Sequence, residues 1–175
     1  GVARIRIYGR MRLKKKINNK TQNLTSVANG AVPIACNNEH FGRAENVLAP
    51  GKGINMGDGW ETRRSRGKNF DWLILKCATS GVIEKLQIDT HHFKGNYPDK
   101  CSVQAGYVKI NSSSKNIVEK SKSWKFLLGK SKLKAHKEHN FKIPKNNKRI
   151  VNYIRINIFP DGGISRLRAF GTVKT

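Results

Sequence analysis

Residues 57–66 carry the densest group of chemically active side chains in this sequence. The segment combines two acids, three arginines, a tryptophan and two glycines, in the order Gly57, Asp58, Gly59, Trp60, Glu61, Thr62, Arg63, Arg64, Ser65 and Arg66. A guanidinium presents a planar pair of donors that matches a carboxylate, and glycines permit the tight backbone of a loop. Because an apolar, strand-like run at 70–75 follows directly, we expect a polar functional loop at the end of a rigid sheet.

Two further polar segments carry groups suited to proton transfer or ligand binding. Asp89 ends a predicted strand and is followed three residues later by His92, and a carboxylate beside a histidine can form a proton-transfer pair. Asn96 lies in the same loop, and the turn at 160–163 contributes Asp161. These acids and histidines show no close ligand spacing, so the sequence gives no ground for predicting a metal.

Short alternating segments separated by turn residues make up most of the remaining chain. The clearest lies at 152–159, where three isoleucines fall on one face and Arg155 and Asn157 on the other. Further strands are predicted at 31–36, 70–75, 82–89, 101–110, 124–128, 139–143 and 163–171. No segment of twelve residues or more has a helical period, which indicates an all-β protein, an antiparallel β-sandwich. Because the loops of a sandwich gather at its ends, we expect the three polar loops to share one end.

Composition and charge narrow the class of protein. The chain has 175 residues, and 35 Lys and Arg against 11 Asp and Glu give a net charge of +24. Its lysine-rich runs lack interleaved aromatic residues and any helix-turn-helix or zinc-finger pattern, so nucleic-acid binding is not expected despite the charge. No apolar run approaches the ~18 residues of a membrane span. The three cysteines show no metal-ligand spacing and are expected to be reduced thiols in an intracellular, cytoplasmic protein.

The two ends of the chain resemble each other. Residues 1–9 match residues 163–171 position for position in residue class, at an interval of 162 residues. Sequence similarity at this interval indicates a tandem repeat of about 160 residues. We therefore expect residues 1–9 to be the last strand of a truncated preceding repeat, 10–26 to be a basic linker, and 27–175 to be one complete β-sandwich repeat.

Several segments, taken together, resemble the C-terminal repeat of the allantoicase family. The matching blocks occur in the family's order and span most of the chain after the linker: Asp58–Arg66, Asp71–Trp72, Gly81–Glu84, Asp89–Pro98 and Pro160–Arg168. The resemblance implies a jelly-roll, discoidin-like (galactose-binding-like) sandwich. It also implies an oligomeric enzyme that hydrolyses allantoate to ureidoglycolate and urea in the degradation of allantoin and purines. The family's first repeat is almost absent from this sequence, and an active site built from both repeats would leave the chain inactive alone.

The substrate that the resemblance implies assigns roles to the loop residues. Allantoate carries a carboxylate and two ureido groups on one carbon, so an enzyme must hold the carboxylate and assist the departure of urea. We expect Arg63 and Arg64 to bind the carboxylate, and Glu61, His92 and Asp89 to carry the acid–base chemistry. The other predicted substrate-binding residues are Asp58, Trp60, Thr62, Asn96 and Asp161. No cofactor is expected, and the expected partners are allantoate and further copies of the chain.

Each candidate also has a purely structural interpretation. Arg63 and Arg64 can pair with nearby acids to brace the loop, Asp58 can cap the backbone amides of a turn, and a loop histidine such as His92 can simply be solvated. For the whole chain, the alternative to an enzyme is a non-catalytic discoidin-like sandwich that binds a ligand or a polyanion, since fold alone does not fix function. A polyanion binder would show affinity that falls steeply with salt.

Overall fold

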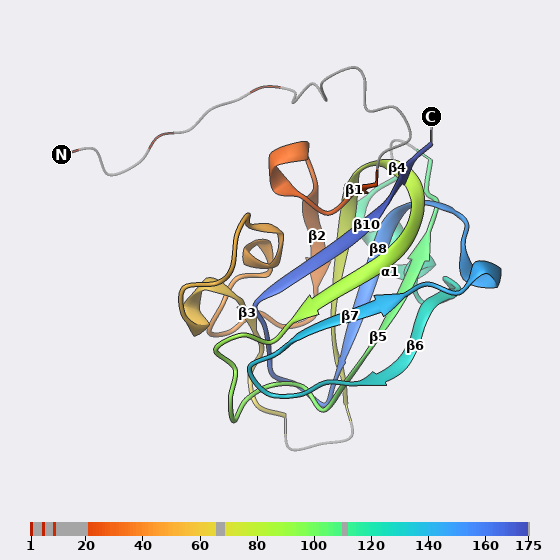
Figure 1. The fold of residues 1–175 in the computed structure, drawn as a ribbon. Coiled ribbons are helices and arrows are strands. Elements are labelled where there is room, and N and C mark those ends of the chain that lie inside the picture. The colour runs from red at the N-terminus through yellow and green to blue at the C-terminus, as the bar shows by residue number, and fades with distance from the viewer. Residues whose placement is uncertain (2–4, 6–8, 10–20, 66–68, 110–111, 175) are drawn as a thin grey trace.

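The computed structural model describes residues 21–65, 69–109 and 112–174, together with Gly1, Ile5 and Gly9. These residues form ten strands, one α-helix and four short 3-10 helices (Figure 1). The strands are β1 (Gln22–Asn23), β2 (Val32–Cys36), β3 (Trp60–Glu61), β4 (Asp71–Asp89), β5 (Lys100–Gly106), β6 (Phe126–Lys132), β7 (Glu138–Lys142), β8 (Ile150–Phe159), β9 (Gly163–Ile164) and β10 (Arg166–Val173). The helices are α1 (Ser114–Ser121), η1 (Val27–Asn29), η2 (Ala44–Leu48), η3 (Met56–Asp58) and η4 (Lys145–Asn147).

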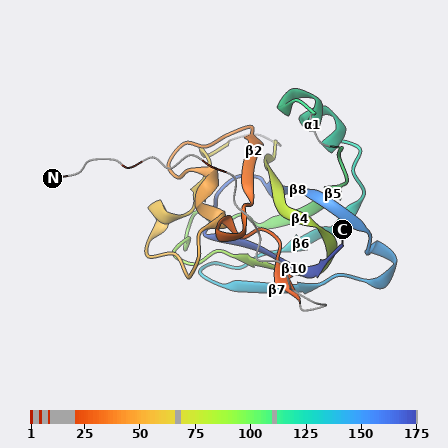
Figure 2. The same ribbon diagram turned by 90° about the horizontal axis from the view of Figure 1, so that it is seen from above.

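Strand β4 belongs to both layers of a β-sandwich. Its first half pairs with β2 on one side and β8 on the other, and its second half pairs with β10 and β7. One layer therefore has the order β2-β4-β8-β5-β6 and the other the order β1-β10-β4-β7, with every pair antiparallel. Seen from above, β7 and β10 lie on the side of the molecule opposite to β2, β8 and α1 (Figure 2). The predicted antiparallel sandwich is confirmed.

The prediction of two separate strands at 70–75 and 82–89 is wrong, because both are parts of the continuous strand β4. The register of β8 against β4 shifts between Lys76 and Gly81, where β4 passes from one layer to the other. A Cβ at Gly81 would lie 2.7 Å from the carbonyl oxygen of Thr172. Glycine therefore permits the close backbone approach at this crossing, and Gly81 lies at an irregularity within one strand.

The two faces of β8 are buried for different reasons. Its three isoleucines point into the core between the layers, as predicted. On the other face Arg155 and Asn157 are also buried. Helix α1 lies on this side of the sheet (Figure 2), next to Arg155, and the Asn157 amide bonds to Ser102 and Gln104 of β5. Arg155 Nη1 donates to Ser121 Oγ of the helix at 2.8 Å. The sequence did not predict α1, since only Ile117 and Ser121 of its residues are buried, too few to make an apolar stripe.

The packed unit begins before its predicted start. Strand β1 pairs with β10, and Leu24 and Thr25 are fully buried. The Thr25 hydroxyl donates to the Leu167 carbonyl at 3.0 Å, so hydrogen bonds and not an apolar pattern hold this polar segment. Residues 22–26 therefore belong to the sandwich and not to the linker. The predicted strand of a preceding repeat at 1–9 falls, apart from three isolated positions, outside the described residues, as does most of the linker.

Two of the three cysteines are core residues, and Cys36 packs against the core. All three are free thiols within the described ranges, and Cys77 and Cys101 are buried. Burial raises the pKa of both buried thiols to about 12, so they stay protonated and unreactive at neutral pH. In the same ranges, the longest helical segments are too short and too polar to cross a membrane.

Candidate functional site

A groove of about 560 Å³ opens where three polar loops meet at one end of the sandwich. The loops follow β3, connect β4 to β5, and follow β8. Five of the predicted site residues line this groove: Glu61, Thr62, Arg64, Asn96 and Asp161. The other lining residues are Phe41, Ser65, Gly95, Tyr97, Asp99, Pro160 and Gly162. The three loops thus meet as expected, while the other five predicted residues lie elsewhere.

The two-stranded sheet of β3 and β9 carries Glu61 to the groove. Glu61 pairs with Gly163 in this sheet. The buried Thr62 donates its backbone N–H to the Gly162 carbonyl at 3.1 Å and accepts the Gly162 N–H on Oγ1 at 3.1 Å. Gly162 has a φ of 128°, and a Cβ there would lie 2.6 Å from the carbonyl oxygen of Asn96. Glycine is therefore needed both for the backbone conformation and for the close approach of the neighbouring loop.

The Glu61 carboxylate lies half-buried in the groove and is oriented by Asn96. The Asn96 side-chain amide donates to Glu61 Oε1. The Glu61 carbonyl accepts the His40 and Phe41 backbone amides at 3.1 and 3.2 Å, so its backbone is held as well. A carboxylate offers about four acceptor positions, and one amide donor leaves capacity for a water molecule or a ligand.

Asp161 fixes the course of the arginine segment. Its Oδ2 accepts the Ser65 backbone N–H at 2.6 Å, and Asn38 Oδ1 accepts the Arg63 backbone N–H at 3.2 Å. The side chains of Arg63 and Arg64 are exposed, and neither guanidinium has a partner in the described part of the chain. The interpretation that these two arginines brace the loop through ion pairs is therefore wrong. Arg64 lines both the groove and a second pocket, and Arg63 lines the second pocket alone.

Asp58 and Trp60, which were predicted to bind substrate, are engaged in holding the fold. Asp58 Oδ2 accepts from Arg166 Nη2 at 2.7 Å and from the Ile54 backbone N–H at 3.1 Å. Burial alone would raise the pKa of Asp58, but the Arg166 and Ile54 hydrogen bonds outweigh it, so this pKa lies below its ordinary value. The Trp60 side chain is fully buried, and its indole N–H donates to the Asn38 carbonyl at 2.9 Å. Both side chains support the loop from beneath.

Asp89 pairs with His91 and not with His92. The buried Asp89 accepts the His91 backbone N–H on Oδ1 at 2.9 Å, and the same oxygen lies 2.8 Å from His91 Nδ1. Aspartate commonly reaches the backbone two residues ahead when a turn follows. His92 has a φ of 71°, and its Nε2 lies 2.8 Å from the Gly53 carbonyl oxygen. The predicted Asp89–His92 pair is therefore wrong, and neither residue lines the groove.

His136 joins this histidine cluster although its place in a lysine-rich run gave no signal of it. Its Nδ1 accepts the His92 backbone N–H at 2.9 Å, and its ring lies 4.5 Å from the His91 ring. Loss of hydration, followed by the nearby His91 and Lys94, lowers the pKa of His136, so Nδ1 is free to accept at neutral pH. In the described ranges, no three His, Cys, Asp or Glu side chains are arranged to hold a metal ion.

Fold and groove together define a jelly-roll, discoidin-like sandwich with a charged groove among its end loops. A sequence model described as the allantoicase repeat matches residues 22–174. The chain is 48% identical to a probable allantoicase 1 from Burkholderia mallei, over 99% of this chain and 52% of the relative. It is also 48% identical to a probable allantoicase from Pseudomonas fluorescens strain Pf0-1, over 99% of this chain and 53% of the relative. The chain belongs to the allantoicase family, and it spans about half the length of these curated relatives.

Solved structures support the same fold. The crystal structure of allantoicase from Saccharomyces cerevisiae superposes with a TM-score of 0.75 at 37% identity, over 86% of this chain and 43% of that one. A fucolectin from the striped bass Morone saxatilis superposes with a TM-score of 0.64 at 10% identity, over 87% of this chain and 49% of that one. The fucolectin likeness concerns the fold alone. Together they confirm the predicted discoidin-like, jelly-roll class.

Proposed function

We propose that this chain forms part of an allantoicase, which hydrolyses allantoate to ureidoglycolate and urea in allantoin and purine degradation. One observation supports this most directly. In a member of the allantoicase family, a groove of ligand size is lined by an oriented carboxylate, Glu61, and by Arg64, whose guanidinium has no partner among the described residues. We further propose that the sandwich is the second of two tandem repeats in a cytoplasmic homo-oligomer.

Arg64 is the residue we assign to the substrate carboxylate. Arg64 lines the groove and its guanidinium has no partner among the described residues, so it can bind a carboxylate without first breaking an ion pair. A bidentate contact of this kind fixes both the position and the orientation of the anion. Arg63 was predicted to share this task, but its side chain lines the neighbouring pocket and not the groove.

Glu61 is assigned as the general base. In the proposed reaction its carboxylate takes a proton from water, the water oxygen bonds to the carbon that carries both ureido groups, and the bond from that carbon to one ureido nitrogen breaks. The protonated Glu61 returns its proton to the departing nitrogen, so that urea leaves, ureidoglycolate remains and the carboxylate is restored. Asn96 keeps the carboxylate aimed into the groove, which is the geometric requirement for proton transfer.

Asp161, Asn96 and the histidine loop complete the proposed site. Asp161 lines the groove and uses one oxygen on the Ser65 amide, so its remaining acceptor capacity suits the N–H groups of a ureido substituent. His92 lines an adjoining hollow that shares Gly95 and Asn96 with the groove. We therefore assign His92, and Asp89 behind it, to positioning the Asn96 loop and not to contact with the reacting atoms.

Replacing Arg64 with alanine is expected to raise the KM for allantoate by about 10- to 100-fold, because a charge-assisted hydrogen bond contributes ~1.5–3 kcal/mol. The effect should appear mainly in KM, since the carboxylate is not the reacting group. Urea release from allantoate by the complete protein measures it. Arg43→Ala is the matched control, because Arg43 is an exposed arginine paired only with Glu45 and lies outside the groove. An unchanged KM in Arg64→Ala would remove Arg64 from the site.

A further inference from the structure

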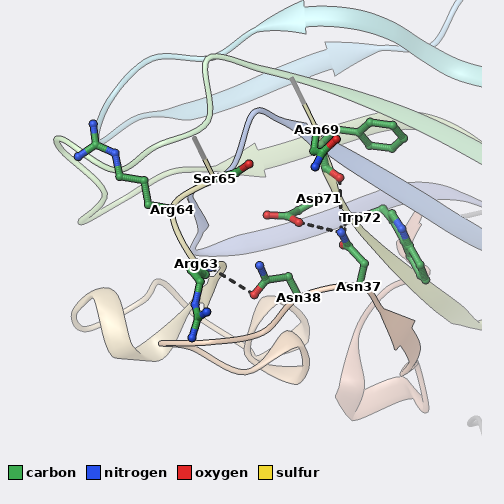
Figure 3. Close-up of a pocket in the computed structure, with 9 residues that line it drawn as sticks. Asn37, Asn38, Arg63, Arg64, Ser65, Asn69, Asp71 and Trp72 are labelled. Atoms are coloured by element: carbon green, nitrogen blue, oxygen red, sulfur yellow. Dashed lines mark hydrogen bonds between the residues drawn. The ribbon is translucent and has the colours of Figure 1, made fainter. Parts of the chain in front are cut away.

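A second pocket of about 530 Å³ lies beside the groove, on the far side of the arginine segment. Arg64 and Ser65 separate the two, since they line both. The pocket's other walls are three asparagine side chains, two aromatic side chains, Arg63 and Asp71 (Figure 3). The proposed reaction in the groove makes no use of these groups.

Asp71 supplies the unusual feature of this pocket. It is the first residue of β4 and is only 7% exposed. Its Oδ1 accepts the Asn37 side-chain amide at 2.8 Å, but its Oδ2 is buried without a hydrogen-bond partner among the described residues. Figure 3 shows the carboxylate directed into the space between Asn37–Asn38 and Arg63–Ser65. A buried acceptor left unpaired costs free energy, and native proteins rarely carry one without a functional reason.

Asn37 makes this arrangement rigid. Its Oδ1 accepts the Trp72 backbone N–H at 2.7 Å, while its backbone N–H donates to the Trp72 carbonyl at 3.2 Å. Its side-chain amide donates to Asp71. Asn37 therefore joins the end of β2 to the start of β4. It also fixes the Asp71 carboxylate, whose Oδ1 is hydrogen-bonded while Oδ2 has no donor among the described residues.

The chemistry of the walls indicates the class of ligand. The unpaired Asp71 Oδ2 requires an N–H or O–H donor, while the exposed, unpaired Arg63 guanidinium suits an anion. The Asn37 amide is already used within the fold, but the side-chain N–H₂ of Asn38 or Asn69 can donate to a carbonyl oxygen. A small molecule with a carboxylate at one end and a terminal N–H₂ next to a carbonyl at the other meets all three requirements, and a ureido acid has this constitution.

We infer that this pocket is a binding site for a ureido acid, with Asp71 Oδ2 accepting the terminal N–H₂ and Arg63 binding the carboxylate. The choice of ureido acids over other bifunctional anions rests on the proposed function of the neighbouring groove. Because Asp71 lies just beneath the pocket surface, a small rotation of its carboxylate brings Oδ2 to the ligand while Oδ1 keeps its bond to Asn37.

Two probes that differ in one group test this inference. N-carbamoylglycine ends in N–H₂, and N-acetylglycine carries a methyl group in its place. The chain is expected to bind N-carbamoylglycine about 10- to 100-fold more tightly, as a hydrogen bond to a charged acceptor implies. Calorimetry or ligand-detected NMR measures both affinities, and the indole N–H signal of Trp72 should shift because this residue lines the pocket.

Asp71→Asn should abolish the preference between the probes. The asparagine oxygen can still accept the Asn37 amide, and its N–H₂ then takes the place of Oδ2. Because two N–H₂ groups cannot hydrogen-bond to each other as donors, the probe's terminal N–H₂ loses its acceptor. Asp99→Asn is the control, because Asp99 is an exposed carboxylate on the groove side, 3.0 Å from Lys100. An unchanged cooperative unfolding transition in both variants shows that the fold is intact.

The outcomes separate this pocket from the proposed reaction. Loss of the preference in Asp71→Asn and its retention in Asp161→Asn and Asp99→Asn support the pocket, whether or not the protein releases urea from allantoate. Equal affinity of the chain for the two probes overturns the inference. So does a preference that survives in Asp71→Asn. Its disappearance in Asp161→Asn, which removes the groove carboxylate proposed to bind ureido N–H groups, would then place the probe in the groove.

Discussion

Replacing Glu61 with glutamine is expected to lower the rate of urea release from allantoate by about 100- to 10,000-fold, the contribution typical of a positioned general base. Glutamine keeps a side-chain oxygen that can accept the Asn96 amide, so the groove retains its shape and only the proton acceptor is lost. The fall should therefore appear in kcat with little change in KM. Initial rates at saturating allantoate, measured on the complete protein, give this value.

Glu119→Gln is the matched control for Glu61→Gln. Glu119 lies on α1, exposed, and pairs with Lys122 at 2.9 Å, so its replacement should leave the rate unchanged. A Glu61→Gln rate within threefold of the unmodified protein would show that another group accepts the proton. Asp161 would then be the first alternative, because it lines the groove and was predicted from the sequence to be a site residue.

Strand positions were predictable wherever a period of two was undisturbed. Ile154, Ile156 and Ile158 alternate with polar residues, and β8 was found with nearly correct ends. The prediction failed where hydrogen bonds or crossings replace an apolar pattern. The buried Thr25 is held by a bond to a backbone carbonyl, and Gly81 marks a change of layer within one strand, which no local pattern distinguishes from a turn.

The sequence predicted which loops meet at the candidate site, but it did not predict which side chains hydrogen-bond to each other there. The end of a sandwich brings its loops together whatever their sequence, so Glu61, Asn96 and Asp161 were found as members of one groove. Partners depend on details that spacing does not encode. Asp89 bonds to His91 because of the turn immediately after β4, and Asp58 bonds to Arg166, a residue 108 positions away in the chain.

Replacing Asp58 with asparagine is expected to lower the free energy of unfolding by about 2–3 kcal/mol at pH 7. Removing one partner of a fully buried ion pair costs ~3–5 kcal/mol, and the Asp58 side chain is 31% exposed, so solvent reduces the loss. The Arg166 side chain is 2% exposed and would keep a buried charge without its counter-ion. The unfolding midpoint should fall by about 4–12 °C, at ~2–4 °C per kcal/mol for a chain of this size.

The pH dependence of this loss identifies its electrostatic origin. Because the pKa of Asp58 is lower in the folded protein than its ordinary value of 3.8, the pair contributes stability above that pH, and the contribution is lost as the pH falls through the folded value. The difference in unfolding free energy between the unmodified protein and Asp58→Asn should therefore be full at pH 7 and shrink below about pH 4. Urea denaturation at several pH values measures it.

Asp99→Asn separates this buried pair from the general effect of removing a negative charge from a strongly basic chain. Asp99 and Lys100 form an exposed pair, which is expected to contribute only ~0–0.5 kcal/mol. If both variants lost the same small amount, the Asp58–Arg166 contact would be no stronger than a surface pair. A larger loss confined to Asp58→Asn would show that Asp58, which was predicted to bind substrate, instead stabilises the fold through Arg166. In that case the Asp58–Arg166 pair holds η3 against β10. Because η3 lies immediately before β3, the pair also supports the strand that carries Glu61, although neither residue lines the groove.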